Sequence, residues 1–264
     1  DDGTFSQYSI IYHRMLLDLL SILELLRTVL GLPRFSKIFY KKVSVAYNWY
    51  CEMIDDISFD CPNIGANDGT YILNYNNLKY RDFRPTASFT SSVFNYPLKI
   101  ELWKNQPLVE IFNLKKPTLF NSDPKSLFFD KGGFIKLVNK NGSIFFRYPN
   151  FKFRPSHSDA LHIDIWKEGE NWIRDAGSYS YALEDTDLDN FSGTKGHSTI
   201  QFDTLNQMPR LTRFLFGNWL KPEIVEFNNE KNIAISSYVD YKKNSHKREI
   251  KSHANGWDIF DEIG

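Results

Sequence analysis

Three side chains in the second half of the sequence, His157, Asp175 and His197, are good ligands for first-row metals. Each lies near the end of a predicted strand, so one edge of a sheet could bring them together. Three nitrogen or oxygen ligands that leave a fourth position open are a common zinc arrangement. A histidine at a strand end is more often a hydrogen-bonded structural residue. The spacing by itself therefore leaves a metal site and a structural role as alternatives.

A second group of reactive side chains lies near the start of the sequence, in residues 7–14. Tyr8 and Tyr12 are four residues apart, which predicts that they share one face of a helix. Tyr12, His13 and Arg14 would then place a phenol, an imidazole and a cation together. The alternative is a helix face with two packed aromatic rings, and without further context the residues favour that interpretation.

Four arginines are candidates for contacts with carboxylates or sulfates, because a guanidinium binds such groups through two parallel hydrogen bonds. They are Arg14, Arg81, Arg84 and Arg154. Each is equally expected as an ordinary surface or capping residue.

Two helices are predicted to precede any sheet. Leucine and isoleucine recur at helical spacing over residues 5–31, and a second helical pattern covers residues 35–53. The two patterns predict a helical hairpin. Residues 62–92 are rich in Asn, Gly and Asp, and Pro85 predicts an irregular segment because it pushes the preceding residue away from helix. One more short helix is possible within residues 86–115.

From about residue 118 the hydrophobic period changes towards two, which is typical of strands. Asn141-Gly142 predicts a tight turn between strands at residues 134–138 and 143–147. Strands that follow helices without alternating with them indicate an α+β fold with an antiparallel β-sandwich. We expect domains at residues 1–95 and 96–264. Further strand-like runs occupy residues 161–166, 171–174, 198–202, 224–227 and 233–238.

Composition narrows the class of protein. Lys plus Arg and Asp plus Glu are 32 each, so the net charge is zero, which argues against a general nucleic-acid binder. Any polyanion must then bind in a local cleft that carries arginines.

Aromatic residues make up 16% of the chain; some can stack on sugar rings, although core packing is the expected role of most. Charged residues interrupt the longest apolar stretch, residues 16–32, so we expect no transmembrane segment.

Four motifs in one order resemble the heparinase II/III-like polysaccharide lyases. Residues 175–181, Asp-Ala-Gly-Ser-Tyr-Ser-Tyr, match the family pattern Asp-x-Gly-(Ser/Thr)-x-x-Tyr, and His197-Ser198-Thr199 is similar to its later His-Asn-Thr. Residues 7–13 are similar to its Glu-Gln-Ser-x-x-Tyr-His helix segment. Residues 63–69 resemble its Gly-Asp-x-Asp-Gly loop.

The resemblance implies a fold and an activity. The fold would be the last helices of an (α/α) toroid, residues 1–95, followed by an antiparallel sandwich that is incomplete here. The chain opens with Asp1-Asp2-Gly3, so we expect a piece of a longer protein. The activity would be β-elimination on an anionic, uronic acid-containing polysaccharide, in the periplasm or outside the cell.

The resemblance also implies roles for individual residues. Tyr12 becomes the catalytic base or acid, with Tyr8 as the alternative one helical turn away. His157, Asp175 and His197 hold a divalent metal, zinc first, in a supporting role. Substrate would meet the side chains of Tyr8, Asn67, Arg84 and Arg154.

One departure weakens the inference to catalysis. The first His of the family pattern His-x-His-x-Asp aligns with Pro155, whose side chain cannot transfer a proton. His162 is the nearest substitute, and His13 is another. Two further interpretations are therefore kept: a non-catalytic family member that binds or helps to process a polysaccharide, and a structural α+β module.

Overall fold

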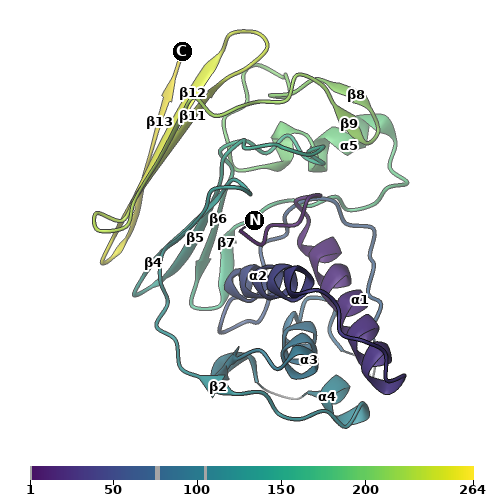
Figure 1. The fold of residues 1–264 in the computed structure, drawn as a ribbon. Helices are drawn as coiled ribbons and strands as arrows, with labels where there is room; N and C mark the ends of the chain where they lie inside the picture. Colours follow the sequence, from purple (N-terminus) through teal and green to yellow (C-terminus); the bar gives the residue numbers. More distant parts are fainter. Residues whose placement is uncertain (1, 75–77, 104–105) are drawn as a thin grey trace. The chain divides into compact units, whose positions relative to one another are not determined.

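The computed structural model describes residues 2–74, 78–103 and 106–264, and the chain forms two compact units (Figure 1). The helical unit comprises Asp1–Phe5, Ile10–Cys61 and Gly69–Asp123. The sandwich unit comprises Ser6–Ser9, Pro62–Asp68 and Pro124–Gly264. The division differs from the expected boundary after residue 95, because residues 96–123 belong to the helical unit and two short early segments belong to the sandwich unit.

Both predicted long helices form in the helical unit. Ser36 caps the second helix by accepting a hydrogen bond from the Phe39 N–H (3.2 Å), as N-cap serines do. Two short strands pair in parallel after the third helix. The elements are α1 (Ile10–Val29), α2 (Lys37–Met53), α3 (Arg84–Phe94), β1 (Leu98–Lys99), η1 (Ile100–Leu102), α4 (Pro107–Ile111) and β2 (Leu119–Phe120).

The helix α3 begins where the sequence predicted an irregular segment. Pro85 occupies its first turn. Proline is tolerated there because backbone N–H groups in the first turn have no acceptor within the helix, so the missing N–H costs no hydrogen bond. Asp82 Oδ1 accepts the backbone N–H of Arg84 (3.1 Å), which secures the helix start. The helix ends at Asn95, whose left-handed backbone (φ 55°) suits a C-terminal cap.

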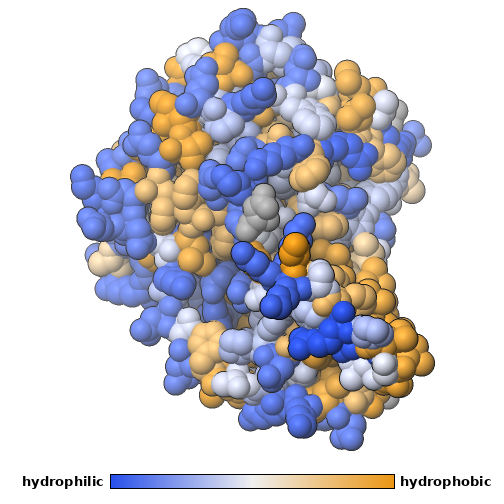
Figure 2. Space-filling view, viewed as in Figure 1, coloured by the Kyte–Doolittle hydropathy of each residue, from blue (hydrophilic) through white to orange (hydrophobic). Residues whose placement is uncertain are grey.

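Helix α1 buries polar side chains beside the apolar side chains of Ile10, Ile11 and Leu17. Its polar side chains point into the unit: Thr86 Oγ1 donates to Asp18 Oδ1 (2.7 Å), and Ser21 bonds Thr90 (3.0 Å). Its outer side carries leucines that are about half exposed, Leu19, Leu23 and Leu26. Hydrophobic side chains gather on the surface where α1 ends (Figure 2). A helix that is apolar on its outer side is typical of one that packs against further protein.

Two antiparallel sheets make up the sandwich unit, in agreement with the predicted α+β class (Figure 1). The first has the order β3-β4-β5-β6-β7, and the second the order β10-β11-β12-β13. The strands of the first are β3 (Leu127–Phe129), β4 (Phe134–Asn139), β5 (Gly142–Arg147), β6 (Ile163–Lys167) and β7 (Glu170–Ile173). Those of the second are β10 (Ile224–Asn228), β11 (Ile233–Val239), β12 (Ser245–His253) and β13 (Gly256–Ile263).

The two sheets share one apolar core, to which Phe146 of β5 and Tyr238 of β11 both contribute. The predicted tight hairpin is confirmed, because Asn139 pairs with Gly142 across it. The predicted strand at residues 198–202 is wrong, since these residues join no sheet. Between the sheets in sequence lie α5 (Asp185–Phe191), η2 (Thr194–Gly196) and the small pair β8 (Arg210–Thr212) and β9 (Leu215–Phe216).

Among the residues that the structure describes, no helix combines the length and the apolar character needed to cross a bilayer.

Candidate functional site

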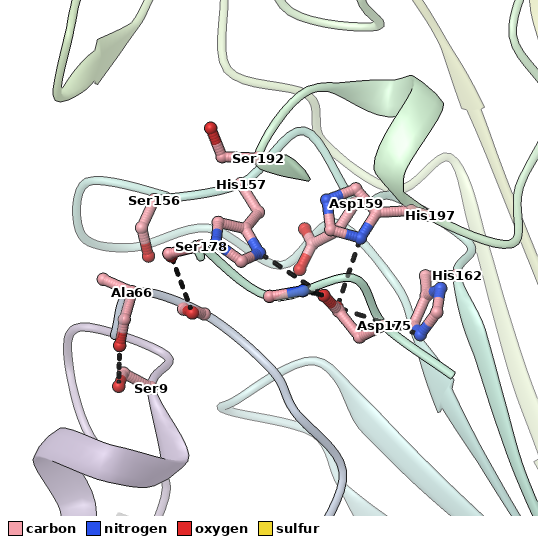
Figure 3. A network of polar contacts seen from close by, with 12 residues as sticks. Ser9, Ala66, Ser156, His157, Asp159, His162, Asp175, Ser178, Ser192 and His197 are labelled. Atoms are coloured by element: carbon pink, nitrogen blue, oxygen red, sulfur yellow. Dashed lines mark hydrogen bonds and ion pairs between the residues drawn. The ribbon is translucent and has the colours of Figure 1, made fainter. Parts of the chain in front are cut away.

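Three buried side chains, His157, Asp175 and His197, gather in the sandwich unit (Figure 3). Their ligand atoms all lie within 4.8 Å of one another. Asp175 Oδ2 is 3.2 Å from His197 Nδ1, and Asp175 Oδ1 is 3.8 Å from His157 Nδ1. His157 precedes β6, Asp175 follows β7, and His197 follows η2. The fold therefore brings together the three predicted metal ligands.

Hydrogen bonds decide which nitrogen of His157 faces this cluster. Its Nε2 lies 3.0 Å from Ser178 Oγ, and the Ser178 hydroxyl donates to the Gly65 carbonyl (3.3 Å). Because that hydroxyl proton is already used, Ser178 accepts the proton of Nε2, and His157 Nδ1 carries a lone pair. This Nδ1 has no hydrogen-bond partner among the described residues. Burial lowers the pKa of His157 to about 3, so the ring is neutral, as a metal ligand must be.

Asp175 is held ionised and in a fixed orientation. Burial by itself would raise the pKa of its carboxyl, but His197 and the two other nearby histidines outweigh burial and lower it. In the same way, burial opposes the charge on His197, but Asp175 outweighs it and raises the pKa of that ring. Oδ1 of Asp175 accepts the Gly177 N–H (2.7 Å), and the Asp175 N–H donates to Asp164 Oδ2 (3.2 Å).

His162 lies beside the cluster, and a hydrogen bond shows which of its ring nitrogens carries the proton. The Ser198 N–H donates to His162 Nδ1 (2.9 Å), so the ring proton sits on Nε2, which faces Asp175 Oδ2 at 3.8 Å (Figure 3). The side chain is buried, and burial lowers its pKa to about 3. These contacts argue against the catalytic role predicted for His162. His162 instead accepts the N–H of the residue that follows His197, and its Nε2 lies near the Asp175 carboxylate without a hydrogen bond to it among the described residues.

The cluster suits a divalent metal. A tetrahedral zinc ion with ligands at about 2.0–2.1 Å places those ligands roughly 3.3 Å apart. The two separations from Asp175, 3.2 and 3.8 Å, are close to that value. An orphaned buried nitrogen such as His157 Nδ1 would otherwise cost about 1–3 kcal/mol. His157, Asp175 and His197 can therefore hold such an ion and leave a fourth position open.

The loop of residues 62–68, which includes the predicted substrate residue Asn67, lies against this cluster within the sandwich unit. Ser9 Oγ donates to the Ala66 carbonyl (2.5 Å), next to the Gly65 carbonyl that orients Ser178 (Figure 3). Gly177 has φ +72°, and a Cβ there would meet Asn63 Nδ2 at 2.2 Å. A side chain at Gly177 would therefore displace the side chain of Asn63 and would strain the backbone there. Asn67 itself is half-buried.

Tyr8 is a structural residue of the sandwich unit. It precedes α1 and has φ 51°, so the prediction that it shares a helix face with Tyr12 is wrong. Its buried hydroxyl accepts the N–H of Lys152 (2.8 Å), and its ring lies under the Arg147 guanidinium at 4.6 Å. These contacts argue against the predicted role of Tyr8 in stacking on a sugar.

His13 and Arg84 are also engaged within their own unit. His13 is buried, its Nε2 lies 2.9 Å from the Ala46 carbonyl, and its ring stacks on Trp49 at 4.8 Å. Burial lowers its pKa to about 4. Arg84 makes a two-pronged bond to Asp82 (2.9 and 2.6 Å), which already pairs its charge. The structure thus argues against a catalytic His13 and a substrate-binding Arg84.

Tyr12 and Arg154 are less buried than Tyr8 and His13. Tyr12 is half-buried in the first turn of α1, and Arg154 is exposed three residues before His157. Sequence reasoning missed an exposed group, Tyr179, although it lies in the quoted 175–181 motif. This tyrosine is 77% exposed, has φ 53°, and stacks on Phe191 at 5.1 Å.

The fold and the site define a β-sandwich protein with a buried His-Asp-His cluster, preceded by a helical unit. The Heparinase II/III-like, C-terminal family model matches residues 121–263, more than half of the chain. The chain belongs to this family.

Solved structures show the same fold. A heparinase III aligns with TM-score 0.72 and 17% identity, over 100% of this chain and 39% of that one. A mutant of the heparan sulfate lyase HepC from Pedobacter heparinus aligns with TM-score 0.66 and 18% identity, over 99% of this chain and 38% of that one. The search of curated proteins found no sequence match. This chain spans about 39% of the length of the heparinase III.

Proposed function

We propose that this chain is part of a polysaccharide lyase that cleaves a uronic acid-containing polysaccharide by β-elimination. The proposal rests on the family match together with the fold shared with heparinase III and a heparan sulfate lyase over nearly the whole chain. The same family resemblance supports a location of the protein outside the cytoplasm, in the periplasm or outside the cell. The outward leucines of α1 support a place for the helical unit at the end of an (α/α) toroid.

The reaction sets clear chemical requirements. The C5 proton of a uronate is weakly acidic, and its removal builds negative charge on the neighbouring carboxylate. A base must take that proton, and an acid must protonate the leaving O4. One tyrosine can serve in both steps, provided that a nearby cation lowers its pKa.

Tyr12 is the residue we assign to this role. It corresponds to the tyrosine of the family's N-terminal motif, and it is half-buried, whereas the other predicted catalytic residues, His13 and His162, are buried. His13, which follows it, is committed to the core. Tyr12→Phe should therefore abolish turnover and leave substrate binding intact.

Substrate contacts on the sandwich unit would come from Arg154 and Tyr179. Arg154 offers a guanidinium that pairs well with a uronate carboxylate or a sulfate. Tyr179 offers an exposed ring, and its stack on Phe191 holds that ring in place. Both groups flank the cluster in sequence, three residues before His157 and four after Asp175.

His157, Asp175 and His197 would hold a divalent metal, with zinc the first candidate, that supplies positive charge and cross-links three segments of the sandwich. Ser178 would orient His157 through its hydrogen bond to Nε2, and His162 would hold the backbone next to His197 by accepting the N–H of Ser198. The role of these residues is then to hold the substrate-facing segments in place.

The experiment is an assay of the full-length protein on a panel of uronate-containing polysaccharides, following the ultraviolet absorbance of the unsaturated product. The expected result is product from at least one polysaccharide, and none after Tyr12→Phe. Tyr241→Phe, on the sandwich unit, serves as the matched control. Full activity of Tyr12→Phe would reject the assigned role.

A second function is favoured by one observation. Pro155 is buried where the family pattern has its first histidine, and it cannot move a proton. A protein that has lost catalysis and binds or helps to process a polysaccharide would give no unsaturated product from any substrate, yet would retain binding that Arg154→Ala or Tyr179→Ala weakens.

A further inference from the structure

A pair of residues on the second sheet makes direct contact with the segments that carry the His-Asp-His cluster. The Arg248 side chain of β12 is almost fully buried and forms two parallel bonds with Asp261 of β13, at 2.7 and 2.8 Å. The two residues are direct partners in the sheet register. His246 Nε2 also lies 2.7 Å from the same carboxylate. Two side chains on the same face of β12, those of His246 and Arg248, therefore hold Asp261.

The remaining donor group of Arg248 reaches away from the sheet. Its Nη1 donates to the carbonyl of Leu161 and to the carbonyl of Ser198, each at 2.6 Å. Leu161 directly precedes His162, and Ser198 directly follows His197. One guanidinium nitrogen thus joins the backbone beside two histidines that are 35 residues apart in the sequence.

Both joined segments carry residues next to the cluster. Leu161 has a left-handed backbone (φ 58°), which is costly for a residue with a branched side chain. The Ser198 N–H donates to His162 Nδ1, and the proton on His162 Nε2 faces Asp175. Movement at the Leu161 carbonyl would therefore shift the adjacent His162, and movement at the Ser198 carbonyl would shift the adjacent His197, whose Nδ1 lies 3.2 Å from Asp175 Oδ2.

We propose that Arg248 and Asp261 are positioning residues for the metal cluster, which set its affinity for a divalent ion from the opposite sheet. Arg248 supplies the contacts, and Asp261 fixes the guanidinium plane so that Nη1 points at both carbonyls. Arginine suits this task because its planar fork bonds a carboxylate and still presents further donors in fixed directions, whereas lysine offers one point charge. The inference rests on the metal site of the proposed function.

The test is metal binding by the purified chain, measured with Zn²⁺ against a chromophoric chelator and with Co²⁺ by its visible absorption. Groups that orient metal ligands typically change affinity about 10–100-fold when removed. We expect losses of this size in Arg248→Lys and in Asp261→Asn, with a changed Co²⁺ spectrum. The stability of the metal-free protein is measured alongside by urea unfolding.

The chain offers a matched control on the same two strands. Lys247 and Glu262 form the neighbouring register pair, bonded at 3.4 Å, with side chains 39% and 77% exposed. Lys247→Gln removes a cross-strand ion pair of the same sheet without touching the cluster, and its metal affinity should equal that of the wild type. His197→Ala marks the complete loss of the site.

The outcomes separate the two ideas. If the wild type binds no more metal than His197→Ala, the metal site fails and the pair has no metal to position. If the wild type binds metal and both variants bind it equally tightly with the same Co²⁺ spectrum, the positioning role is overturned while the metal site stands. Should Arg248→Lys not fold, Asp261→Asn decides the question, because it retains every donor of Arg248.

Discussion

The change Tyr8→Phe distinguishes a structural tyrosine from one that binds sugar. The substitution keeps the ring, with its edge-on contact to Phe151 (5.9 Å) and its place under Arg147 (4.6 Å), and it removes the hydroxyl. That oxygen accepts the N–H of Lys152 at 2.8 Å and that of Phe153 at 3.3 Å. Tyr8 is 6% exposed, so the variant leaves these N–H groups facing a phenyl ring.

A donor that loses its partner in a buried setting costs about 1–3 kcal/mol of folding free energy. For a unit of this size, each kcal/mol lowers the melting temperature by about 2–4 °C. Urea and thermal unfolding of the chain measure the change, with Tyr179→Phe as the control, since an exposed hydroxyl should shift stability by less than about 0.5 kcal/mol. Oligosaccharide affinity should not change. Wild-type stability combined with weakened oligosaccharide binding would refute the reasoning, because the hydroxyl would then serve the substrate.

Three further predictions follow from the same contacts. Burial raises the pKa of Asp18 to about 7, whereas its ordinary value in the unfolded chain is 3.8. Between these two pH values the native state binds more protons than the unfolded state, so the free energy of unfolding falls as pH rises from about 4 to 7. Asp18→Asn should remove this loss, and its advantage in urea unfolding should grow by roughly 2–3 kcal/mol from pH 5 to pH 8; an advantage independent of pH would contradict the assignment. Ser178→Ala frees Nε2 of His157 and should weaken Zn²⁺ binding about 10–100-fold in a chelator titration, which an unchanged affinity would disprove. Removal of bound metal with a chelator should lower the melting temperature of the wild type but not of His197→Ala, and an equal shift in both would place the metal elsewhere.

The strands and helices with strong local signals are the ones that sequence reasoning found. The hairpin of β4 and β5 has alternating apolar residues on both sides of Asn141-Gly142, and both signals are local. The strand β12 was not predicted, because its sequence Ser-His-Lys-Arg-Glu-Ile-Lys-Ser-His carries few apolar residues. His246 and Arg248 are buried on the inner side of this strand. Asp261 on the next strand accepts hydrogen bonds from both side chains, which allows these polar groups to be buried.

The predicted site residues whose contacts argue against their assigned roles share one feature. Tyr8, His13 and Arg84 were assigned from residue type, but their roles depend on partners that no spacing reveals. Tyr8 meets Lys152, 144 residues away, and His13 meets the Ala46 carbonyl, 33 residues away. A polar side chain near a functional motif can form hydrogen bonds with backbone groups or with a substrate. Only the residues that surround it in the folded structure show which of the two it does.

The sequence by itself determined the α+β order of elements, the likeness to one family, and which three residue types gather as a candidate metal site. The order of elements follows from hydrophobic period and turn chemistry, and the family likeness with its ligand residues follows from short motifs; all are properties of short stretches. Only the tertiary structure decided that His157 presents Nδ1, that His162 carries its proton towards Asp175, and that Arg248 braces both segments. The reason is physical: a ring's protonation state and a side chain's freedom are set by hydrogen bonds and burial from residues that are distant in the chain and adjacent only after folding.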